Sequence, residues 1–202
     1  MVGIIDYGVG NLFSLKSSLA YIGVEAEVVS DEKAILACDR LILPGVGAFG
    51  DAAKALRDSG LDKVVIRAAN EGKPLMGICL GMQLLFEKGL EFGEHEGLGL
   101  IPGTVVPIEP LVDGNKIPHI GWNSLIFSEN SADIYKYTSN GDFVYFVHSY
   151  HAECPKEYIT ATTEYGGILT ASVQKGNVMG AQYHPEKSGD IGLRILKSFC
   201  EF

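Results

Sequence analysis

The stretch Lys73-Pro-Leu-Met-Gly-Ile-Cys-Leu-Gly-Met-Gln83 decides the fold of this chain. Its apolar run from Leu75 to Ile78 predicts a buried strand, and the residues from Met82 to Phe86 predict a helix. Cys79 stands at the turn that joins them, with a glycine two residues away on either side. A strained turn of this kind holds a nucleophile out at the carboxyl end of a sheet, and the free N–H groups of the helix favour a thiolate. The alternative interpretation is a structural cysteine in an ordinary turn.

Strands and helices alternate through the rest of the first half of the chain. Apolar runs predict strands at Val2–Asp6, Glu25–Val29 and Leu41–Pro44. Helical patterns cover Leu12–Tyr21, Asp51–Arg57 and Leu61–Asn70. This alternation predicts a parallel sheet with helices on both faces.

The second half of the chain consists mainly of short β-type runs. They cover Gly103–Ile108, Phe143–Val147, Tyr158–Thr163, Ala171–Gln174 and Val178–Tyr183, with a hairpin turn at Lys175–Asn177. A final helix is expected at Asp190–Glu201, because its apolar residues share one face. We therefore expect a single α/β domain over residues 1–202, built on a central mixed, mostly parallel sheet with helices on both faces.

The composition is typical of a compact cytoplasmic protein. The chain has 202 residues, of which 47% are hydrophobic and 20% are charged, which predicts one domain. A net charge of −9 without any basic run disfavours a nucleic-acid partner. No apolar stretch approaches the roughly 20 residues of a membrane span, and the N-terminus lacks the pattern of a signal peptide. The four scattered cysteines indicate a reducing compartment.

A nucleophilic cysteine needs a base, and the base needs an orienting group. His184 follows the last expected strand and opens the segment His184-Pro-Glu186. Pro185 favours an extended conformation at His184, and residues two apart in an extended segment point the same way. Glu186 is therefore expected to reach back to the imidazole and fix its tautomer.

The reaction of such a cysteine also needs N–H donors for an oxyanion. One is expected at Leu80, the residue after the nucleophile. The second is expected in Pro44-Gly-Val-Gly47, which follows a neighbouring strand and whose glycines let a peptide plane reorient. The alternative for this segment is a glycine-rich turn that leads into the next helix.

Two weaker motifs are too incomplete to predict a cofactor or a metal site. The segment Tyr7-Gly-Val-Gly-Asn11 lacks the third glycine of a dinucleotide fingerprint, because Phe13 stands there. His148 and His151 have the spacing of a metal motif, but alternating strand geometry would send them to opposite faces, and a metal site needs three or more ligands.

Taken together, the segments from Asp6–Asn11 through the Cys79 turn to His184–Lys187 resemble the class I, or triad-type, glutamine amidotransferases, over essentially the whole chain. Within that class, Leu43–Gly47, Pro118-His-Ile-Gly-Trp-Asn123 and Tyr145–Tyr150 are similar to the family of glutaminase subunits of imidazole glycerol phosphate synthases. The resemblance implies a flavodoxin-like fold and hydrolysis of glutamine through a Cys79 glutamyl thioester, with His184 as base and acid and Glu186 orienting it.

The resemblance also implies further site residues. It assigns Gly45, Val46 and Leu80 to the oxyanion hole and Gly47, Gln83, Ser149 and Tyr150 to glutamine binding. It assigns an interface with a partner to Asn11, Trp122, Asn123, Tyr145 and Lys187. For Trp122, the single tryptophan, packing in the core is the other interpretation.

A partner is also expected from the length of the chain. Only 18 residues follow His184, which is enough for a final helix and not for a domain that accepts ammonia. The resemblance identifies the partner as a (β/α)8 cyclase subunit, which uses channelled ammonia to make imidazole glycerol phosphate and aminoimidazole carboxamide ribonucleotide in histidine biosynthesis. The alternatives are the glutaminase of another class I amidotransferase, a stand-alone cysteine hydrolase on the same scaffold, and a non-catalytic scaffold.

Overall fold

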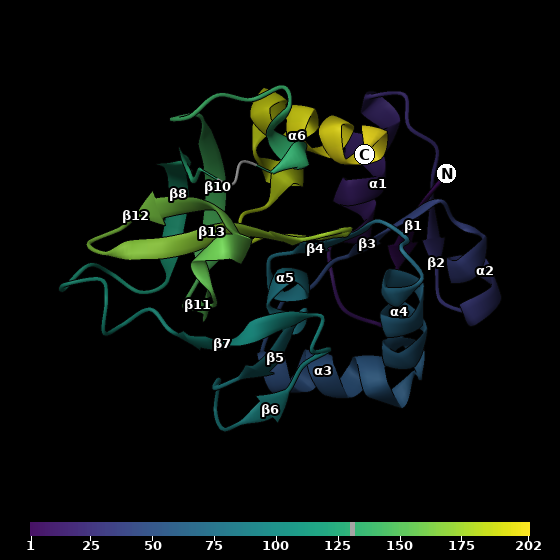
Figure 1. Ribbon diagram of the computed structural model, residues 1–202, viewed down its shortest axis with the longest axis horizontal. Coiled ribbons are helices and arrows are strands. Elements are labelled where there is room, and N and C mark those ends of the chain that lie inside the picture. The colour runs from purple at the N-terminus through teal and green to yellow at the C-terminus, as the bar shows by residue number, and fades with distance from the viewer. Residues whose placement is uncertain (130–131) are drawn as a thin grey trace.

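The computed structural model describes residues 1–129 and 132–202, and an eight-stranded sheet forms its centre (Figure 1). Five strands run parallel in the order β2 (Ala26–Val29), β1 (Val2–Ile5), β3 (Arg40–Leu43), β4 (Leu75–Ile78) and β14 (Val178–Ala181). The sheet continues in antiparallel pairing through β13 (Ile168–Lys175), β12 (Ile159–Glu164) and β9 (Ile126–Phe127). The expectation of a central mixed, mostly parallel sheet is confirmed.

Helices cover both faces of this sheet, as expected (Figure 1). On one face lie α1 (Leu12–Tyr21) and α6 (Gly189–Glu201). On the other lie α2 (Glu32–Ala37), α3 (Phe49–Asp58), α4 (Leu61–Asn70) and the short α5 (Leu80–Leu84). None of the helices among the described residues is long and apolar enough to cross a membrane.

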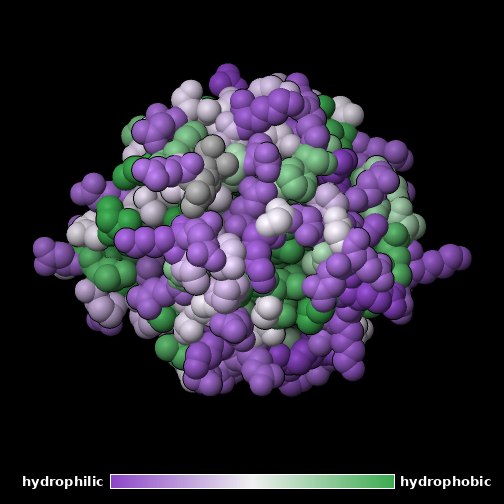
Figure 2. All heavy atoms as spheres, viewed as in Figure 1, coloured by the Kyte–Doolittle hydropathy of each residue, from purple (hydrophilic) through white to green (hydrophobic). Residues whose placement is uncertain are grey.

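Alternation along the parallel strands produces two hydrophobic cores, one on each face. In β3, Leu41 and Leu43 pack under α3 and α4, whereas Ile42 packs under α1 and α6. In β4, Leu75 and Met76 divide between the two cores in the same way. Side chains two residues apart share a face of a strand, so a buried sheet needs apolar residues at every position. In the view of Figure 2, the outer surface is mainly hydrophilic, with small separate apolar groups.

Two smaller sheets stand beside the central one. A two-stranded sheet pairs β8 (His119–Ser124) with β10 (Phe143–His148). A four-stranded sheet has the order β11 (Tyr150–Glu153), β7 (Ile101–Pro107), β5 (Phe86–Gly89) and β6 (His95–Glu96). The 3-10 turns are η1 (Asp133–Tyr135), η2 (Lys156–Tyr158) and η3 (Pro185–Lys187).

Several sequence expectations about these elements are wrong. The helix expected at Met82–Phe86 begins earlier and ends at Leu84, and Phe86 opens strand β5. The elements α2, β5, β6, β8, β9 and β11 were not expected. They are short. Apart from β5 and β6, which pair with each other in a local hairpin, the strands among them pair with partners far away in sequence, so local periodicity does not predict them. The strand expected at Val178–Tyr183 stops at Ala181.

The turn after β4 is built by close backbone contacts that only glycine permits. A Cβ atom on Gly81 would lie 1.8 Å from the carbonyl oxygen of Leu43, and one on Gly77 would lie 2.5 Å from the carbonyl oxygen of Gly81. Helix α5 therefore packs directly against the ends of β3 and β4. Cys79 lies at the start of this helix with φ 54° and ψ −113°, a conformation that L residues rarely adopt.

Replacing Gly81 by alanine is expected to destabilise the fold by about 3 kcal/mol or more, because the added methyl group meets backbone that cannot move aside cheaply. Chemical denaturation would measure the loss. Gly72→Ala is the matched control: Gly72 has φ 91° and open space around its Cβ position, so only the backbone cost of about 1–2 kcal/mol applies. Equal losses in the two variants would contradict the close-contact argument.

Candidate active site

The candidate site lies where three neighbouring parallel strands end. Strand β4 lies between β3 and β14, and the carboxyl ends of parallel strands meet at one edge of a sheet. The chain leaves β3 into the Gly45–Gly47 loop, β4 into Cys79, and β14 towards His184. The topology thus brings together three segments that are widely separated in sequence.

Cys79 lies in a strained and buried turn. The residue is 8% exposed. Its Sγ lies 3.9 Å from Nε2 of Gln182 and 4.0 Å from the carbonyl oxygen of Val147. The thiol therefore faces a narrow space between the end of β14 and strand β10 and stands at the N-terminus of α5, where backbone N–H groups are free to favour negative charge.

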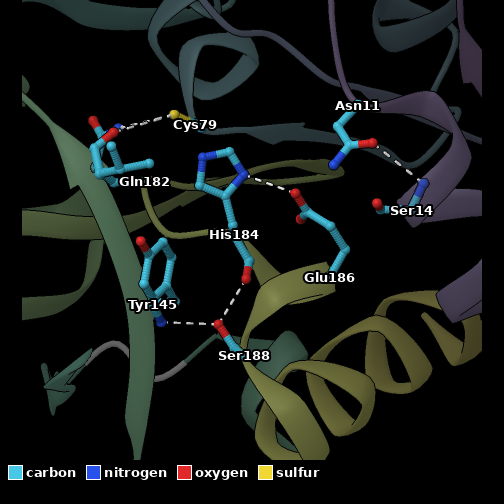
Figure 3. Close-up of polar contacts among 9 residues, drawn as sticks. Asn11, Ser14, Cys79, Tyr145, Gln182, His184, Glu186 and Ser188 are labelled. Carbon is cyan, nitrogen blue, oxygen red and sulfur yellow. Dashed lines mark hydrogen bonds and ion pairs between the residues drawn. The ribbon is translucent and has the colours of Figure 1, made fainter. Parts of the chain in front are cut away.

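His184 lies between the thiol and Glu186 (Figure 3). Its Nδ1 is 2.8 Å from Oε1 of Glu186, and both side chains are almost fully buried. His184 itself is extended, as expected, but Pro185–Lys187 form the 3-10 turn η3. It is this turn, and not a continuous extended segment as predicted, that brings the Glu186 carboxylate back to the ring.

The backbone of His184 is tied to strand β10 and to the start of α6. Its N–H donates to the carbonyl oxygen of Tyr145 at 2.9 Å. The hydroxyl of Ser188 donates to the His184 carbonyl at 2.6 Å and accepts from the Tyr145 N–H at 2.9 Å (Figure 3). These three bonds fix the position of the imidazole relative to the thiol.

The pKa of His184 reflects two opposing effects. Burial lowers the pKa, but the hydrogen bonds and charges of Cys79 and Glu186 outweigh burial and raise it to about 9. The ring is therefore protonated at neutral pH. An imidazolium next to a cysteine favours the thiolate, which is the nucleophilic form.

A cavity of about 380 Å³ opens in front of these groups. It is lined by residues from every class of the predicted site: Cys79, His184, Val46, Gly47, Leu80, Gln83, Ser149, Tyr150 and Lys187. Gly45 is buried and does not line the cavity, and a Cβ added to it would lie 2.7 Å from the N atom of Gly81. A larger hollow of about 480 Å³ beside α6 and η1 contains none of these residues.

The loop that carries the predicted oxyanion donors is held at both ends. The hydroxyl of Tyr7 donates to the Pro44 carbonyl at 2.8 Å, and the N–H of Phe49 donates to Oε2 of Glu91 at 2.7 Å. Between them, Gly47 has φ 91°, and Val46 is exposed towards the cavity. The glycine allows a backbone conformation at the cavity wall that other residues rarely adopt.

Gln83 is buried and bonded within the protein. Its Nε2 donates to the Tyr150 carbonyl at 3.1 Å and to Oε1 of Gln182 at 3.0 Å. Both amide hydrogens are therefore used, which leaves the amide oxygen for a ligand. This arrangement joins α5 to β11 and stiffens the wall of the cavity near the thiol.

Sequence reasoning missed four residues that line the cavity: Glu91, Pro118, Val147 and His148. Glu91 is the one acidic side chain on this wall among the described residues. It follows strand β5, which was itself not predicted, so no sequence signal places it here. Its carboxylate caps α3 and offers a negative charge to a bound cation or ammonium group.

The predicted interface residues divide into two groups. Trp122 is 55% exposed, so the interpretation as a core residue is wrong. Its ring meets Tyr145 edge-on at 6.2 Å, and Nζ of Lys187 lies 5.9 Å from the Tyr145 ring. In contrast, Asn11 caps α1 by accepting from the Ser14 N–H, and the Asn123 amide bonds to the backbone.

The other histidines show no metal-binding arrangement. Within residues 1–129 and 132–202, no three His, Cys, Asp or Glu side chains gather closely enough to hold a metal ion. His148 ends β10 and bonds to His119 and to the Tyr150 carbonyl. His151 lies on β11 and accepts from the Thr170 N–H at 3.3 Å.

Comparison with known protein families gives a match over nearly the whole chain. The family described as "Glutamine amidotransferase class-I" matches residues 3–201. Relatives named "Imidazole glycerol phosphate synthase subunit HisH" include the protein of Wolinella succinogenes, 47% identical over 204 residues, with 100% of this chain and 99% of the relative covered. The protein of Caldanaerobacter subterraneus subsp. tengcongensis is 50% identical over 202 residues, covering 100% and 98%.

Solved structures support the same fold. "Structure of PurLQS from Thermotoga maritima" superposes with a TM-score of 0.76 at 22% identity, covering 99% of this chain and 97% of the other. "Crystal structure of glutamine amidotransferase" has the same TM-score and coverage at 21% identity. At these identities the likeness bears on the fold alone, and it confirms the expected fold class.

Replacing Glu186 by glutamine is expected to lower the pKa of His184, because the carboxylate is one of the groups that raise it against burial. In the wild-type protein, the stabilisation from the protonated ring is fully present below about pH 6.5, where an unfolded histidine titrates, and is lost as the pH rises through about 9. NMR titration of the imidazole signals would measure the shift. His151, which is not among the groups that act on His184, is the internal control, and an unmoved His184 would contradict the prediction.

Proposed function

The chain belongs to the class I glutamine amidotransferases, and we propose that it is the glutaminase subunit of an imidazole glycerol phosphate synthase in the cytoplasm. The observation that carries the proposal is the contact series from Cys79 through His184 to Glu186, which opens on a cavity of about 380 Å³. The names and high identities of its relatives support the specific synthase.

The reaction begins with attack of the Cys79 thiolate on the carboxamide carbon of glutamine. A C–S bond forms, and negative charge moves to the carboxamide oxygen. The N–H groups of Leu80 and of the Gly45–Gly47 loop stabilise this oxyanion. When the tetrahedral intermediate collapses, the C–N bond breaks and the His184 imidazolium gives its proton to the departing nitrogen, which leaves as ammonia.

Water then completes the cycle. Neutral His184 takes a proton from a water molecule, whose oxygen attacks the carbonyl carbon of the glutamyl thioester. The C–S bond breaks, glutamate leaves, and the thiolate and imidazolium pair is restored. Glu186 holds the ring through Nδ1 in both states, so Nε2 is the nitrogen that exchanges protons with the substrate.

Recognition of glutamine needs groups for its charged ends. Glu91 on the cavity wall suits the α-ammonium group of glutamine. The backbone of Ser149 and Tyr150 and the amide oxygen of Gln83 suit the remaining polar groups. This arrangement favours glutamine over the internal peptide bonds or simple esters that a stand-alone cysteine hydrolase would cleave, because those substrates carry no free α-ammonium group on the residue that is attacked.

A partner is proposed at the mouth of the cavity. Lys187 lines the cavity and lies over the ring of Tyr145, which in turn contacts the exposed Trp122. Exposed aromatic and cationic side chains of this kind are enriched in interface hot spots. A cyclase subunit with a (β/α)8 fold that docks here would receive ammonia next to the thiol before solvent protonates it.

Replacing Cys79 by alanine is expected to abolish glutamine-dependent synthesis in the complex, by on the order of 10³-fold or more. Synthesis from added ammonia should remain, because the variant keeps the docked partner intact. Product formation by the complex would be assayed with each nitrogen source. Cys200→Ala, a change to a cysteine on α6 away from the cavity, is the control and should retain both activities. Loss of both activities in Cys79→Ala would contradict the proposed function.

Replacing Trp122 by alanine is expected to weaken binding of the cyclase subunit by about 2 kcal/mol, or roughly 30-fold in Kd. Isothermal titration calorimetry would measure the affinity. Phe202→Ala is the control. This aromatic is also exposed, but it lies beside Arg40 at the start of β3, at the end of the parallel strands opposite to the candidate site. A wild-type Kd for the Trp122 variant would place the partner on another face.

A further inference from the structure

A directed series of hydrogen bonds connects strand β8, which carries the exposed Trp122, with the wall of the cavity. It begins at the Asn123 side chain, continues through His119 and His148, and ends on the carbonyl oxygen of Tyr150. The three distances are 3.3, 2.9 and 2.9 Å. None of these three side chains takes part in the chemistry described above.

The direction of donation is determined from the Asn123 end. The N–H of Ser124 can only donate, so it marks Oδ1 of Asn123 as the acceptor at 2.8 Å. The carbonyl of Glu164 can only accept, and it bonds Nδ2 of Asn123 at 2.8 Å. Nδ2 is therefore the donor to Nε2 of His119, and that nitrogen carries no proton.

The same direction follows from the Tyr150 end. A carbonyl oxygen only accepts, so Nδ1 of His148 carries its proton. Nε2 of His148 then accepts from Nδ1 of His119. Both ends thus require the same state: two neutral imidazoles, each protonated on Nδ1. A second proton on either ring would place two donors against each other.

The surroundings of the two rings favour this neutral state. His119 and His148 are directly opposite each other in the β8–β10 ladder and are buried. The His119 ring stacks on Phe146 at 4.8 Å and on Tyr165 at 4.2 Å. Burial lowers the pKa of His119 to about 4. Burial, together with the nearby His119, His151 and His184, lowers that of His148 to about 3.

The end of the series is the part of the cavity wall that the proposed reaction uses. The Tyr150 carbonyl accepts from His148 and also from Gln83, while the Ser149 carbonyl accepts from the Ile108 N–H at 3.0 Å. Each carbonyl lies in one plane with the N–H that follows it. Bonding both oxygens therefore fixes the orientation of the peptide N–H groups of Tyr150 and His151.

We propose that Asn123, His119 and His148 form a positioning chain that holds the Ser149–Tyr150 backbone in its glutamine-binding conformation and connects it to the partner-facing strand that carries Trp122. The identity of the ligand rests on the proposed function. The existence of the positioning chain rests on the hydrogen-bond geometry alone. His119 and His148 are positioning residues, because they act on the substrate only through the backbone.

The first test examines only the hydrogen bonds of the positioning chain. Long-range 1H–15N NMR of the full protein with labelled histidine would show which ring nitrogen carries the proton between pH 6 and 8. His119→Phe and His148→Phe assign the two signals. We expect both rings to be neutral and protonated on Nδ1. A proton on Nε2 of either ring, or a charged ring in this range, would overturn the proposal.

The second test is kinetic and uses the complex with the cyclase subunit. His148→Phe should raise the KM for glutamine about tenfold, the cost of one lost hydrogen bond of roughly 1.4 kcal/mol, with a much smaller change in kcat. His148→Asn should recover part of the KM, because its amide can still donate to the Tyr150 carbonyl. Thermal unfolding and ammonia-dependent synthesis would verify that each variant is folded.

His151→Phe is the matched control, since His151 is similarly buried on β11, the next strand in sequence, but is not part of the positioning chain. An unchanged KM in His148→Phe, or an equal rise in His151→Phe, would overturn the positioning role. If the wild-type complex released no glutamate although both rings were protonated on Nδ1, the proposed function would be overturned, but the hydrogen-bond geometry of the positioning chain would not.

Discussion

The close contact between helix α5 and the ends of strands β3 and β4 is the constraint on which the site depends. Gly77 and Gly81 leave no room for a side chain, and the backbone between them turns so sharply that Cys79 adopts a positive φ. Such strain persists only where the surrounding structure over-determines it. This turn places the thiol at the carboxyl edge of the sheet and at the N-terminus of α5, so the reactivity that we propose for the cysteine depends on the packing beneath it.

Three buried histidines close to one another show how neighbours decide the charge of a ring. Desolvation lowers the pKa of all three. For His184 the charges of Cys79 and Glu186 reverse that effect, and the ring is positive at neutral pH. His119 and His148 meet only neutral partners in their hydrogen bonds, and they stay neutral. The ring that we propose as the proton donor thus lies near two uncharged rings for which we propose a positioning role.

Strand β8 connects the exposed surface beside the candidate site with the buried groups behind the cavity wall. Strand β8 presents Trp122 to solvent, while its neighbour Asn123 turns its amide inward to the Glu164 carbonyl and to His119. Lys187 belongs at once to the cavity wall and to the group around Tyr145. A partner bound on this face would therefore contact the same strand that supports the backbone proposed to bind substrate. Strand β8 thus joins the proposed partner surface to the proposed substrate wall.

The sequence by itself determined the parallel half of the fold, the turn around Cys79 and the grouping of His184 with Glu186, because these depend on local apolar runs and on glycine and proline positions. It did not predict α2, the short strands β5, β6, β8, β9 and β11, or the turn η3 that returns Glu186 to the imidazole. Only the tertiary structure decided that Glu91 and His148 line the cavity, that Trp122 is exposed, and that His119 bonds to His148. Those features depend on contacts between residues far apart in the chain, so no local pattern encodes them.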